Sequence, residues 1–192
     1  MITREIIEKY FASEAELLNT GYRREIFLFR GVVVKRVYRG YKRAKDLNFH
    51  EYNNFQRIIS KIPEDMKIHF QTIYNVLNIK NQSFLIAEKI SDDANNLCKS
   101  VTDLGPFDDP DFWSEMDRLV AFLADTDICF TDLHAKNVLV RKREGHPIPV
   151  IVDYKTLGRD FAPWQLELFF KTGRARKMYR KYKRMKKEFK AF

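Results

Sequence analysis

Two stretches decide the fold of this chain: Phe130-Thr131-Asp132-Leu133-His134-Ala135-Lys136-Asn137 and, a little further on, Val150-Ile151-Val152-Asp153. The runs 138–140 and 150–152 are short and built from β-branched or aliphatic residues, which is typical of strands. Residues 141–149 between them hold one Gly and two Pro, as a hairpin connection does. We therefore expect a hairpin that brings Asn137, at the start of one strand, close to Asp153, at the end of the other.

The residue types in these stretches suit the transfer of a phosphoryl group to a hydroxyl. Such a reaction needs a carboxylate that orients the attacking hydroxyl and accepts its proton, and Asp132 fits that role. It also needs hard oxygen ligands for magnesium, which the amide of Asn137 and the carboxylate of Asp153 can supply. An Asp-x-x-x-x-Asn motif alone would equally suit a capped turn before a pair of strands. The strand that ends in Asp153 at the right distance favours the phosphoryl-transfer site.

Segment 132–137 resembles the Asp-x-His-x-x-Asn loop of the protein-kinase-like fold, and of its small-molecule branch in particular. The resemblance implies ATP and Mg²⁺ as cofactors, with Asp153 as the metal-binding Asp that opens the kinase Asp-Phe-Gly motif. Two positions depart from the kinase pattern. Phe130 stands where the His of His-Arg-Asp is expected, and Tyr154-Lys155 follows Asp153 instead of Phe-Gly. His134 is the imidazole expected near the site, where it contacts the loop or a phosphate, or is purely structural.

The first 90 residues resemble the small lobe of a kinase, which consists of strands, one helix and further strands. Apolar spacing and turn residues predict these elements in order: a helix over 1–20, strands over 25–29 and 31–37 joined at Arg30-Gly31, a helix over 46–59 with Asp46 as its N-cap, and strands over 66–80 and 83–90 with Gln82 near their turn. Residues 1–90 would form this N-lobe and residues 91–192 a reduced, helical C-lobe. The predicted fold is therefore α+β, compact and two-lobed.

A lysine lies inside the predicted strand 31–37. Burying Lys35 costs free energy unless its ammonium group reaches a partner. In kinases such a strand Lys contacts the ATP phosphates and pairs with a Glu of the following helix, and Glu51 is the natural partner here. Arg36 competes for this role, because it lies one residue away and faces the opposite side of the strand. The alternative is that Lys35 lies on an edge strand and points to solvent.

Two segments are expected to contact the nucleotide. Backbone groups from Glu88 to Ile90 would meet the adenine edge, because this segment resembles the connection between the two kinase lobes. The loop 20–24 is poor in glycine and offers Gly21 alone, with two adjacent arginines. Arg23 and Arg24 either cover the phosphates by charge or are solvated surface.

A long core helix is predicted after Asp108-Asp109-Pro110-Asp111, because this segment combines N-cap residues with a Pro in the first turn. Apolar residues then recur at helical spacing and predict a buried face: Phe112, Trp113, Met116, Leu119, Val120, Phe122 and Leu123. The end of this helix would deliver the chain to the Asp132 loop, as the long helix before a kinase catalytic loop does.

Length and composition fit a folded domain. The chain has 192 residues, 45% of them apolar and 32% charged, and no apolar run approaches the roughly 20 residues of a membrane-spanning helix. Segment 1–8 mixes charged with apolar residues, unlike a secretory signal. Cys98 and Cys129 lack the spacing of a metal site. These features predict a reduced, cytoplasmic protein.

The net charge of +9 is concentrated at the end of the chain. Residues 171–192 hold 11 Lys or Arg against one acid, a balance of +10, whereas the other 170 residues balance to −1. An apolar stripe recurs there at steps of four and three: Met178, Tyr182, Met185, Phe189 and Phe192. Three interpretations are open. The stripe packs on the C-lobe, the 174–192 helix lies on an anionic surface such as the inner membrane, or it binds nucleic acid. No nucleic-acid motif accompanies the charge, so the third ranks last.

Across nearly the whole chain, the order, the length and several phrases resemble the YrbL family of PhoP regulatory network proteins. The segments that carry this resemblance are Thr20-Gly21-Tyr22-Arg23, Val34-Lys35-Arg36-Val37-Tyr38, Glu51-Tyr52, Ile148-Pro149-Val150-Ile151-Val152-Asp153, Trp164 and the basic tail. The resemblance implies a kinase-like fold. Only 39 residues follow Asp153, fewer than a peptide-binding kinase lobe needs. The expected acceptor is therefore a hydroxyl of a small molecule, a sugar or a lipid headgroup, such as an envelope glycolipid.

The sequence thus predicts an ATP- and magnesium-dependent phosphotransferase. Five residues carry the predicted roles, two at the phosphates, one at the acceptor hydroxyl and two at magnesium: Lys35 and Glu51, Asp132, Asn137 and Asp153. One alternative is a catalytically inactive pseudokinase that senses nucleotide, which the glycine-poor loop favours. The other is an adaptor that binds a membrane or nucleic acid through its tail. The acceptor and the oligomeric state are left open.

Overall fold

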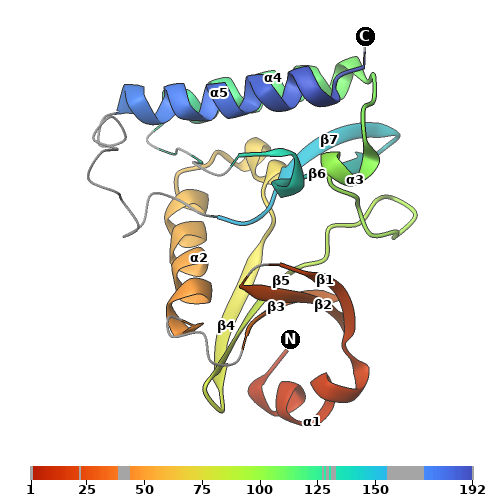
Figure 1. The fold of residues 1–192 in the computed structure, drawn as a ribbon, viewed down its shortest axis with the longest axis vertical. Helices are drawn as coiled ribbons and strands as arrows, with labels where there is room; N and C mark the ends of the chain where they lie inside the picture. Colours follow the sequence, from red (N-terminus) through yellow and green to blue (C-terminus); the bar gives the residue numbers. More distant parts are fainter. Residues whose placement is uncertain are drawn as a thin grey trace. The chain divides into compact units, whose positions relative to one another are not determined.

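The computed structural model describes residues 2–21, 23–38, 44–126, 128, 130, 133–154 and 171–191. The predicted residues Asp132, Cys129, Trp164 and Phe192 lie outside this part of the chain. The chain divides into two compact units. Unit 1 holds Met1–Arg57 and Thr72–Lys89, and unit 2 holds Ile58–Gln71 and Ile90–Phe192. The sheet of unit 1 and the helices of unit 2 make the chain α+β, as predicted (Figure 1).

Unit 1 is built on an antiparallel sheet in the order β1-β2-β3-β5-β4. Its elements follow the chain in this order: α1 (Arg4–Glu14), β1 (Glu16–Thr20), β2 (Arg24–Phe29), β3 (Val32–Val37), α2 (Ala44–Ile59), β4 (Ile73–Ile79) and β5 (Gln82–Glu88). The predicted hairpin at Arg30-Gly31 is confirmed, because Phe29 pairs with Val32 directly across it. Both turn residues have positive φ, 48° and 75°, as a two-residue hairpin loop requires.

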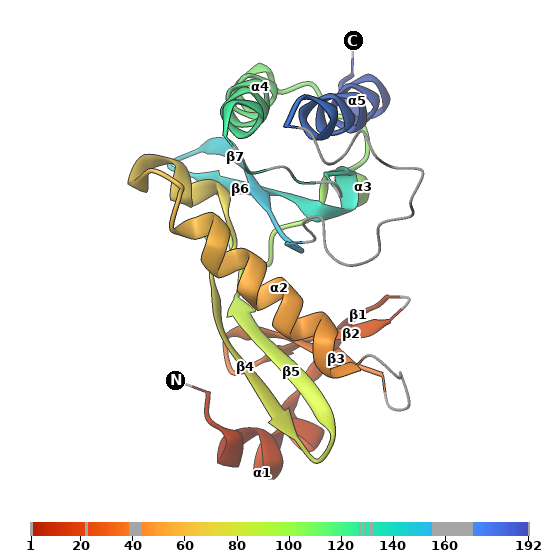
Figure 2. The ribbon, with the colours of Figure 1, turned by 90° about the vertical axis from the view of Figure 1, so that its left-hand side faces the viewer.

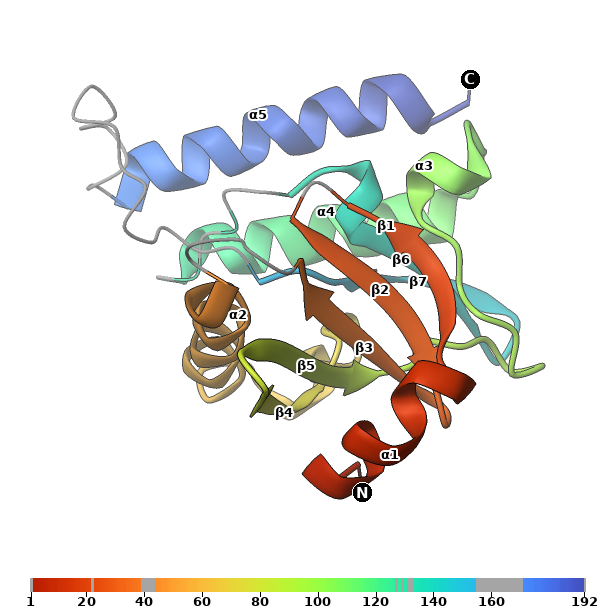
Figure 3. The ribbon, with the colours of Figure 1, turned by 60° about the horizontal axis from the view of Figure 1, so that its bottom comes forward.

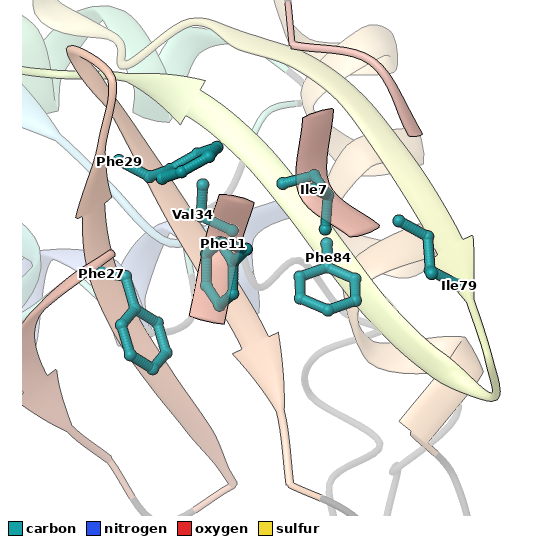
Figure 4. Packing of buried hydrophobic residues seen from close by; sticks show 7 residues of the cluster. All are labelled: Ile7, Phe11, Phe27, Phe29, Val34, Ile79 and Phe84. Carbon is teal, nitrogen blue, oxygen red and sulfur yellow. The ribbon is translucent and has the colours of Figure 1, made fainter. Parts of the chain in front are cut away.

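One face of the sheet is covered by α1. Successive residues of a strand point to opposite faces, so Phe27 and Phe29 share a face, and they meet Phe11 of α1 at ring-centroid distances of 5.0 and 5.3 Å. Figure 4 shows this cluster, which is completed by Ile7, Val34, Ile79 and Phe84. The opposite face of the same strands is therefore left for α2 (Figure 3).

Three predicted boundaries in the first 90 residues are wrong. The first helix ends at Glu14, and residues 16–20 form β1, because Ala15 turns extended and the segment then pairs with β2. The second helix begins at Ala44, so Asp46 lies inside it. Residues 64–69 form a 3₁₀ helix, η1 (Glu64–His69), and the strand starts only at Ile73. Pairing with the next strand decided the first case, and the propensities of residues 16–20 alone do not register such pairing.

Unit 2 consists of helices packed on a hairpin. After η1 its elements are α3 (Val101–Leu104), α4 (Pro110–Asp125), the 3₁₀ turn η2 (Ala135–Asn137), β6 (Val138–Arg143), β7 (His146–Ile151) and α5 (Lys171–Phe189). The predicted start of α4 is confirmed, because the side chain of Asp109 accepts a hydrogen bond from Phe112 N at 3.1 Å, with Pro110 in the first turn. The predicted hairpin is also confirmed, with Glu144 and Gly145 at its turn.

The basic tail is a helix in which three residues of the apolar stripe are buried and a fourth, Phe189, is half-buried. Met178, Tyr182 and Met185 are each at most 4% exposed, and α5 lies beside α4 in Figure 2. Tyr182 donates a hydrogen bond to Asp117 of α4 at 2.6 Å, and Lys186 donates to the other oxygen of the same carboxylate at 2.7 Å. This is the packed arrangement that the first of the three interpretations expects. No helix in the described part of the chain has both the length and the apolar character needed to cross a bilayer.

Candidate functional site

Successive side chains of β3 point to opposite faces of the sheet, and Lys35 lies on the face that packs against α2. Lys35 is only 4% exposed, and its Nζ donates to Oε1 of Glu51 at 2.5 Å. Glu51 lies in the middle of α2 and is 3% exposed. The predicted pair is therefore present, and the alternative of an edge-strand Lys35 in solvent is wrong, because β3 is flanked by β2 and β5.

The competing cation, Arg36, faces the other side of the sheet. It forms an ion pair with Glu25 at 2.7 Å, and its guanidinium lies over the rings of Phe11 and Phe27 at 5.6 and 4.7 Å. Arg36 thus belongs to the α1 face, where it contributes a cation–π contact. Of the two neighbouring cations, Lys35 alone contacts Glu51.

Two residues join this cluster that the sequence did not assign to it. Arg24 donates through Nη1 to Oε2 of Glu51 and to Oδ1 of Asn48. Asn48 is completely buried, and its Nδ2 donates to the backbone carbonyls of Lys35 and Ser83, at 3.0 Å each. Asn48 therefore ties α2 to β3 and β5. The sequence could have indicated Asn48, because it precedes Glu51 by three positions and therefore lies on the same face of the helix.

Lys35 has hydrogen-bonding capacity left over. Its ammonium group carries three N–H donors, and within the described part of the chain Glu51 is its only hydrogen-bond partner. A buried polar group usually has its donors satisfied. Two donors of Lys35 are therefore available to an anionic ligand.

In unit 2, the hairpin brings the backbone segments that carry the predicted metal ligands close together. Val138 pairs with Ile151 across the two strands, and Val152 N donates to Asn137 O at 2.9 Å. Asn137 is thus hydrogen-bonded to the residue that precedes Asp153. The amide nitrogen of Asn137 lies 3.3 Å from Nε2 of His134, so the amide oxygen is the atom suited to a metal. His134 contacts the loop directly, as one of its predicted roles requires.

Asp153 has an unusual backbone conformation, with φ of 65°. The other non-glycine residues with positive φ in the described part of the chain lie in turns: Arg30, Lys80, Asn81, Asn95 and Glu144. Asp153 instead follows the end of β7. Asp tolerates this region better than most residues, and such conformations cluster at functional sites, where the surrounding structure holds them.

The residue after Asp153 acts as an anchor. Tyr154 is fully buried, and its hydroxyl donates to the backbone carbonyl of Gln71 at 2.5 Å. Its ring lies 5.9 Å from that of Phe130, which stacks on Phe70. The two positions that depart from the kinase pattern, 130 and 154, therefore pack against each other, and Tyr154 fixes the chain directly after Asp153.

The segment predicted to meet adenine makes contacts within the protein. Glu88 N donates to Thr72 O at 2.8 Å, and the side chain of Glu88 accepts from Thr72 N at 3.1 Å. The carbonyl of Ile90 accepts from Cys98 N at 3.0 Å. The adenine role of Glu88 and Ile90 stays a prediction, and it would have to use the second lone pair of the Ile90 carbonyl or other backbone groups nearby.

Comparison with models of known protein families shows which family this chain belongs to. A family model described as PhoP regulatory network protein YrbL matches residues 12–190. The chain belongs to the YrbL family. The YrbL match confirms the resemblance predicted from the sequence and begins inside α1. None of the curated proteins compared matches the chain. The YrbL description names a regulatory network and no reaction, so the kinase-like fold and its chemistry stay predictions.

Proposed function

We propose that the chain is an ATP- and magnesium-dependent phosphotransferase of kinase-like fold, acting on a hydroxyl of a small molecule, a sugar or a lipid headgroup. The observation that supports this most is Lys35, which is buried, paired with Glu51 and left with two N–H donors. A Lys held in this way suits the oxygens of a phosphate, because the carboxylate fixes its position while the remaining donors bind the ligand.

Unit 2 supplies two of the oxygen ligands that a magnesium ion needs. Mg²⁺ prefers oxygen ligands and usually keeps waters and substrate phosphates in its shell, with one or two ligands from the protein. Asn137 and Asp153 would supply an amide oxygen and a carboxylate. The described residues contain no group of three or more His, Cys, Asp or Glu that could hold a metal by itself. The site would therefore bind magnesium together with phosphate oxygens, and the ion would neutralise the charge that develops on them.

The remaining steps fall to side chains of the protein. Asp132 would orient the acceptor hydroxyl and accept its proton while the acceptor oxygen forms a bond to the γ-phosphorus. The bond from that phosphorus to the bridging oxygen breaks, and ADP is the leaving group. Lys35 would hold the phosphate oxygens throughout, with Glu51 keeping the ammonium in place. Asn137 and Asp153 would hold the metal.

The test is phosphoryl transfer from labelled ATP to a panel of sugars and lipid headgroups, with wild type, Asp132→Ala and Asp153→Ala. The proposal requires labelled product with wild type and at least about a hundredfold less with either variant. If both variants retain full transfer, the assignment of the site is wrong. A folded wild type that binds ATP but never transfers phosphate to any acceptor or to water would favour the pseudokinase, which the glycine-poor loop at 20–24 also favours.

The proposal places the protein in the cytoplasm, with the basic face of α5 as its contact to an anionic membrane surface. Three residues of the apolar stripe are buried, namely Met178, Tyr182 and Met185. Five basic residues in the described part of the helix are exposed: Arg176, Arg180, Lys183, Arg184 and Lys187. Attraction would thus be mainly electrostatic, since Met178, Tyr182 and Met185 are already packed inside the protein. A nucleic acid would be attracted by the same charges and ranks second.

A further inference from the structure

One buried carboxylate is shared by two cations from neighbouring strands. Oε1 of Glu51 accepts from Lys35 of β3, and Oε2 accepts from Arg24 of β2. The three side chains are 2% to 14% exposed, so water competes little for these contacts. Each oxygen of the carboxylate therefore has its own strong donor.

The register of the sheet produces this arrangement. Ile26 lies opposite Lys35 and Arg24 lies opposite Val37, so Arg24 and Lys35 point to the same face of the sheet, two residues apart along the strands. The same register sends Arg36 to the α1 face, where it pairs with Glu25. The placement of Arg24 beside Glu51 is thus built into the hairpin and does not depend on a mobile loop.

Asn48 fixes the guanidinium on the other side. Its Oδ1 accepts from Arg24 at 3.3 Å, while its Nδ2 is committed to two backbone carbonyls. Because Asn48 and Glu51 share one face of α2, Arg24 spans both with a single nitrogen. A side chain held by a buried amide and a buried carboxylate has little freedom to leave for another partner.

Without Arg24, the carboxylate of Glu51 would lose the donor on Oε2. The nearest remaining cation is Lys35, and a buried carboxylate attracts every donor within reach. Lys35 would then give a second N–H to Glu51, and only one donor would be left for a ligand. The number of ammonium donors that face a phosphate therefore depends on whether Oε2 is already occupied.

We propose that Arg24 is a positioning residue of the phosphate site, which holds Oε2 of Glu51 so that Lys35 binds Oε1 alone and keeps two donors for the phosphates of a nucleoside triphosphate. This inference rests on the proposed function. It gives Arg24 a role different from the two that the sequence left open, since it is neither solvated surface nor a direct cover for the phosphates.

The test is a double-mutant cycle in the affinity for ATP with magnesium, measured by calorimetric titration of the full chain. The variants are Arg24→Met, Lys35→Met and their combination, and Arg36→Met is the control, because it removes a cation from the same sheet on the α1 face. Arg24→Met should weaken binding at least about tenfold and Arg36→Met less than about twofold, with Arg24→Lys recovering most of the loss. The double variant should bind no more weakly than Lys35→Met alone, because Arg24 acts through Lys35.

Two results would overturn this role. The first is an Arg24→Met variant that binds ATP as tightly as wild type. The second is a double variant in which the two losses multiply, which would mean that Arg24 touches the phosphate directly. Thermal unfolding without ligand checks that each variant is folded; should Arg24→Met not fold, Arg24→Lys and Arg24→Gln carry the comparison, with tighter binding expected for the Lys variant and equal binding counting against the role. A folded wild type that does not bind ATP would remove the proposed function itself, and this inference with it.

Discussion

Lys35 and Glu51 form an ion pair of 2.5 Å between a strand and a helix of the same unit, and neither side chain is more than 5% exposed. Arg24 adds a second cation to the same carboxylate. A buried pair of this kind is weak evidence for stability, because desolvation offsets much of the attraction. Removing one partner alone is nevertheless costly, since it leaves an uncompensated charge.

The first prediction concerns this carboxylate. Glu51→Gln should lower the free energy of unfolding by about 3 kcal/mol, because Lys35 and Arg24 would lose their shared counter-ion in a buried place. Urea denaturation at neutral pH measures the loss. Glu25→Gln is the matched control, because Glu25 pairs with Arg36 where both side chains are more than 20% exposed, and it should cost less than about 1 kcal/mol. Equal losses in the two variants would contradict the central position given to Glu51.

The second prediction concerns pH and His69, which is fully buried in unit 2. Burial lowers the pKa of His69 below its ordinary value; the carbonyl of Pro149 and the acids Glu115 and Asp65 oppose the shift, and Arg118 adds to it. The unfolded chain therefore binds this proton more readily than the folded one. Its contribution to stability is present above the unfolded pKa of about 6.5 and is lost as pH falls below that value.

Urea denaturation at pH 7.5 and pH 5.5 tests this prediction. The free energy of unfolding of wild type should fall between the two, and His69→Gln should show a smaller fall. His146, which is exposed at the start of β7, supplies the control variant His146→Gln, which should behave as wild type does. An unchanged pH dependence in His69→Gln would show that another group is responsible.

The third prediction concerns the docking of α5 on α4. Partial burial raises the pKa of Asp117, but the hydrogen bonds from Lys186 and Tyr182 outweigh it, so that the pKa is lowered overall. Asp117 therefore stabilises the fold above its unfolded pKa of about 3.9 and loses this contribution as pH falls through the lower folded value.

A double-mutant cycle with Tyr182→Phe and Asp117→Asn measures this contact. At pH 7 the coupling should be about 1 kcal/mol in the free energy of unfolding, as expected for a hydrogen bond to a partly exposed carboxylate. At pH 3 the coupling should be smaller. Strictly additive losses at pH 7 would mean that the hydrogen bond contributes nothing to the docking of α5.

The fold and the candidate site differ in how far the sequence predicts them. The start of α4 was predicted correctly, because it depends only on neighbouring residues. Asp109 caps the first turn of the helix and Pro110 lies within that turn. Strand β1 was taken for part of a helix, because only its pairing with β2 makes residues 16–20 extended. Residues 66–69 were taken for strand but belong to η1. The chain just after η1 is held by a contact that the spacing of residues does not give, since Gln71 N donates to Ile151 O, eighty residues away in the sequence.

The candidate site likewise contains residues that the sequence predicts and residues that only the folded structure reveals. The pair of Lys35 and Glu51 was expected, because the kinase resemblance specifies both positions. Asn48 was missed, since a polar residue on a helix ordinarily predicts an exposed position, and its burial depends on carbonyls of two strands. Arg24 was seen only as one of two arginines in a loop. Its contact with Glu51 requires the register of β2 against β3, which the spacing of residues alone does not give.

The fourth prediction concerns the exposed charge of α5. The protein should float with vesicles rich in anionic lipid at low salt, and replacing Arg176, Arg180 and Lys183 by Gln should weaken binding by about 1 kcal/mol for each charge. Replacing the exposed residues Lys61, Lys80 and Lys142 by Gln removes the same charge elsewhere and should have little effect. Equal losses in the two triple variants would show attraction by net charge alone, and binding to a polyanionic nucleic acid in preference to vesicles would favour the other partner.

The most direct test of the central claim is thermal unfolding with ATP, with and without magnesium, on wild type and on Asp153→Asn. Ligand at about a hundred times its dissociation constant should add roughly 2.7 kcal/mol to the free energy of unfolding, which raises the midpoint measurably. We expect a magnesium-dependent rise in wild type that Asp153→Asn loses. No rise in wild type at millimolar ATP would contradict the nucleotide site and, with it, the proposed phosphotransferase.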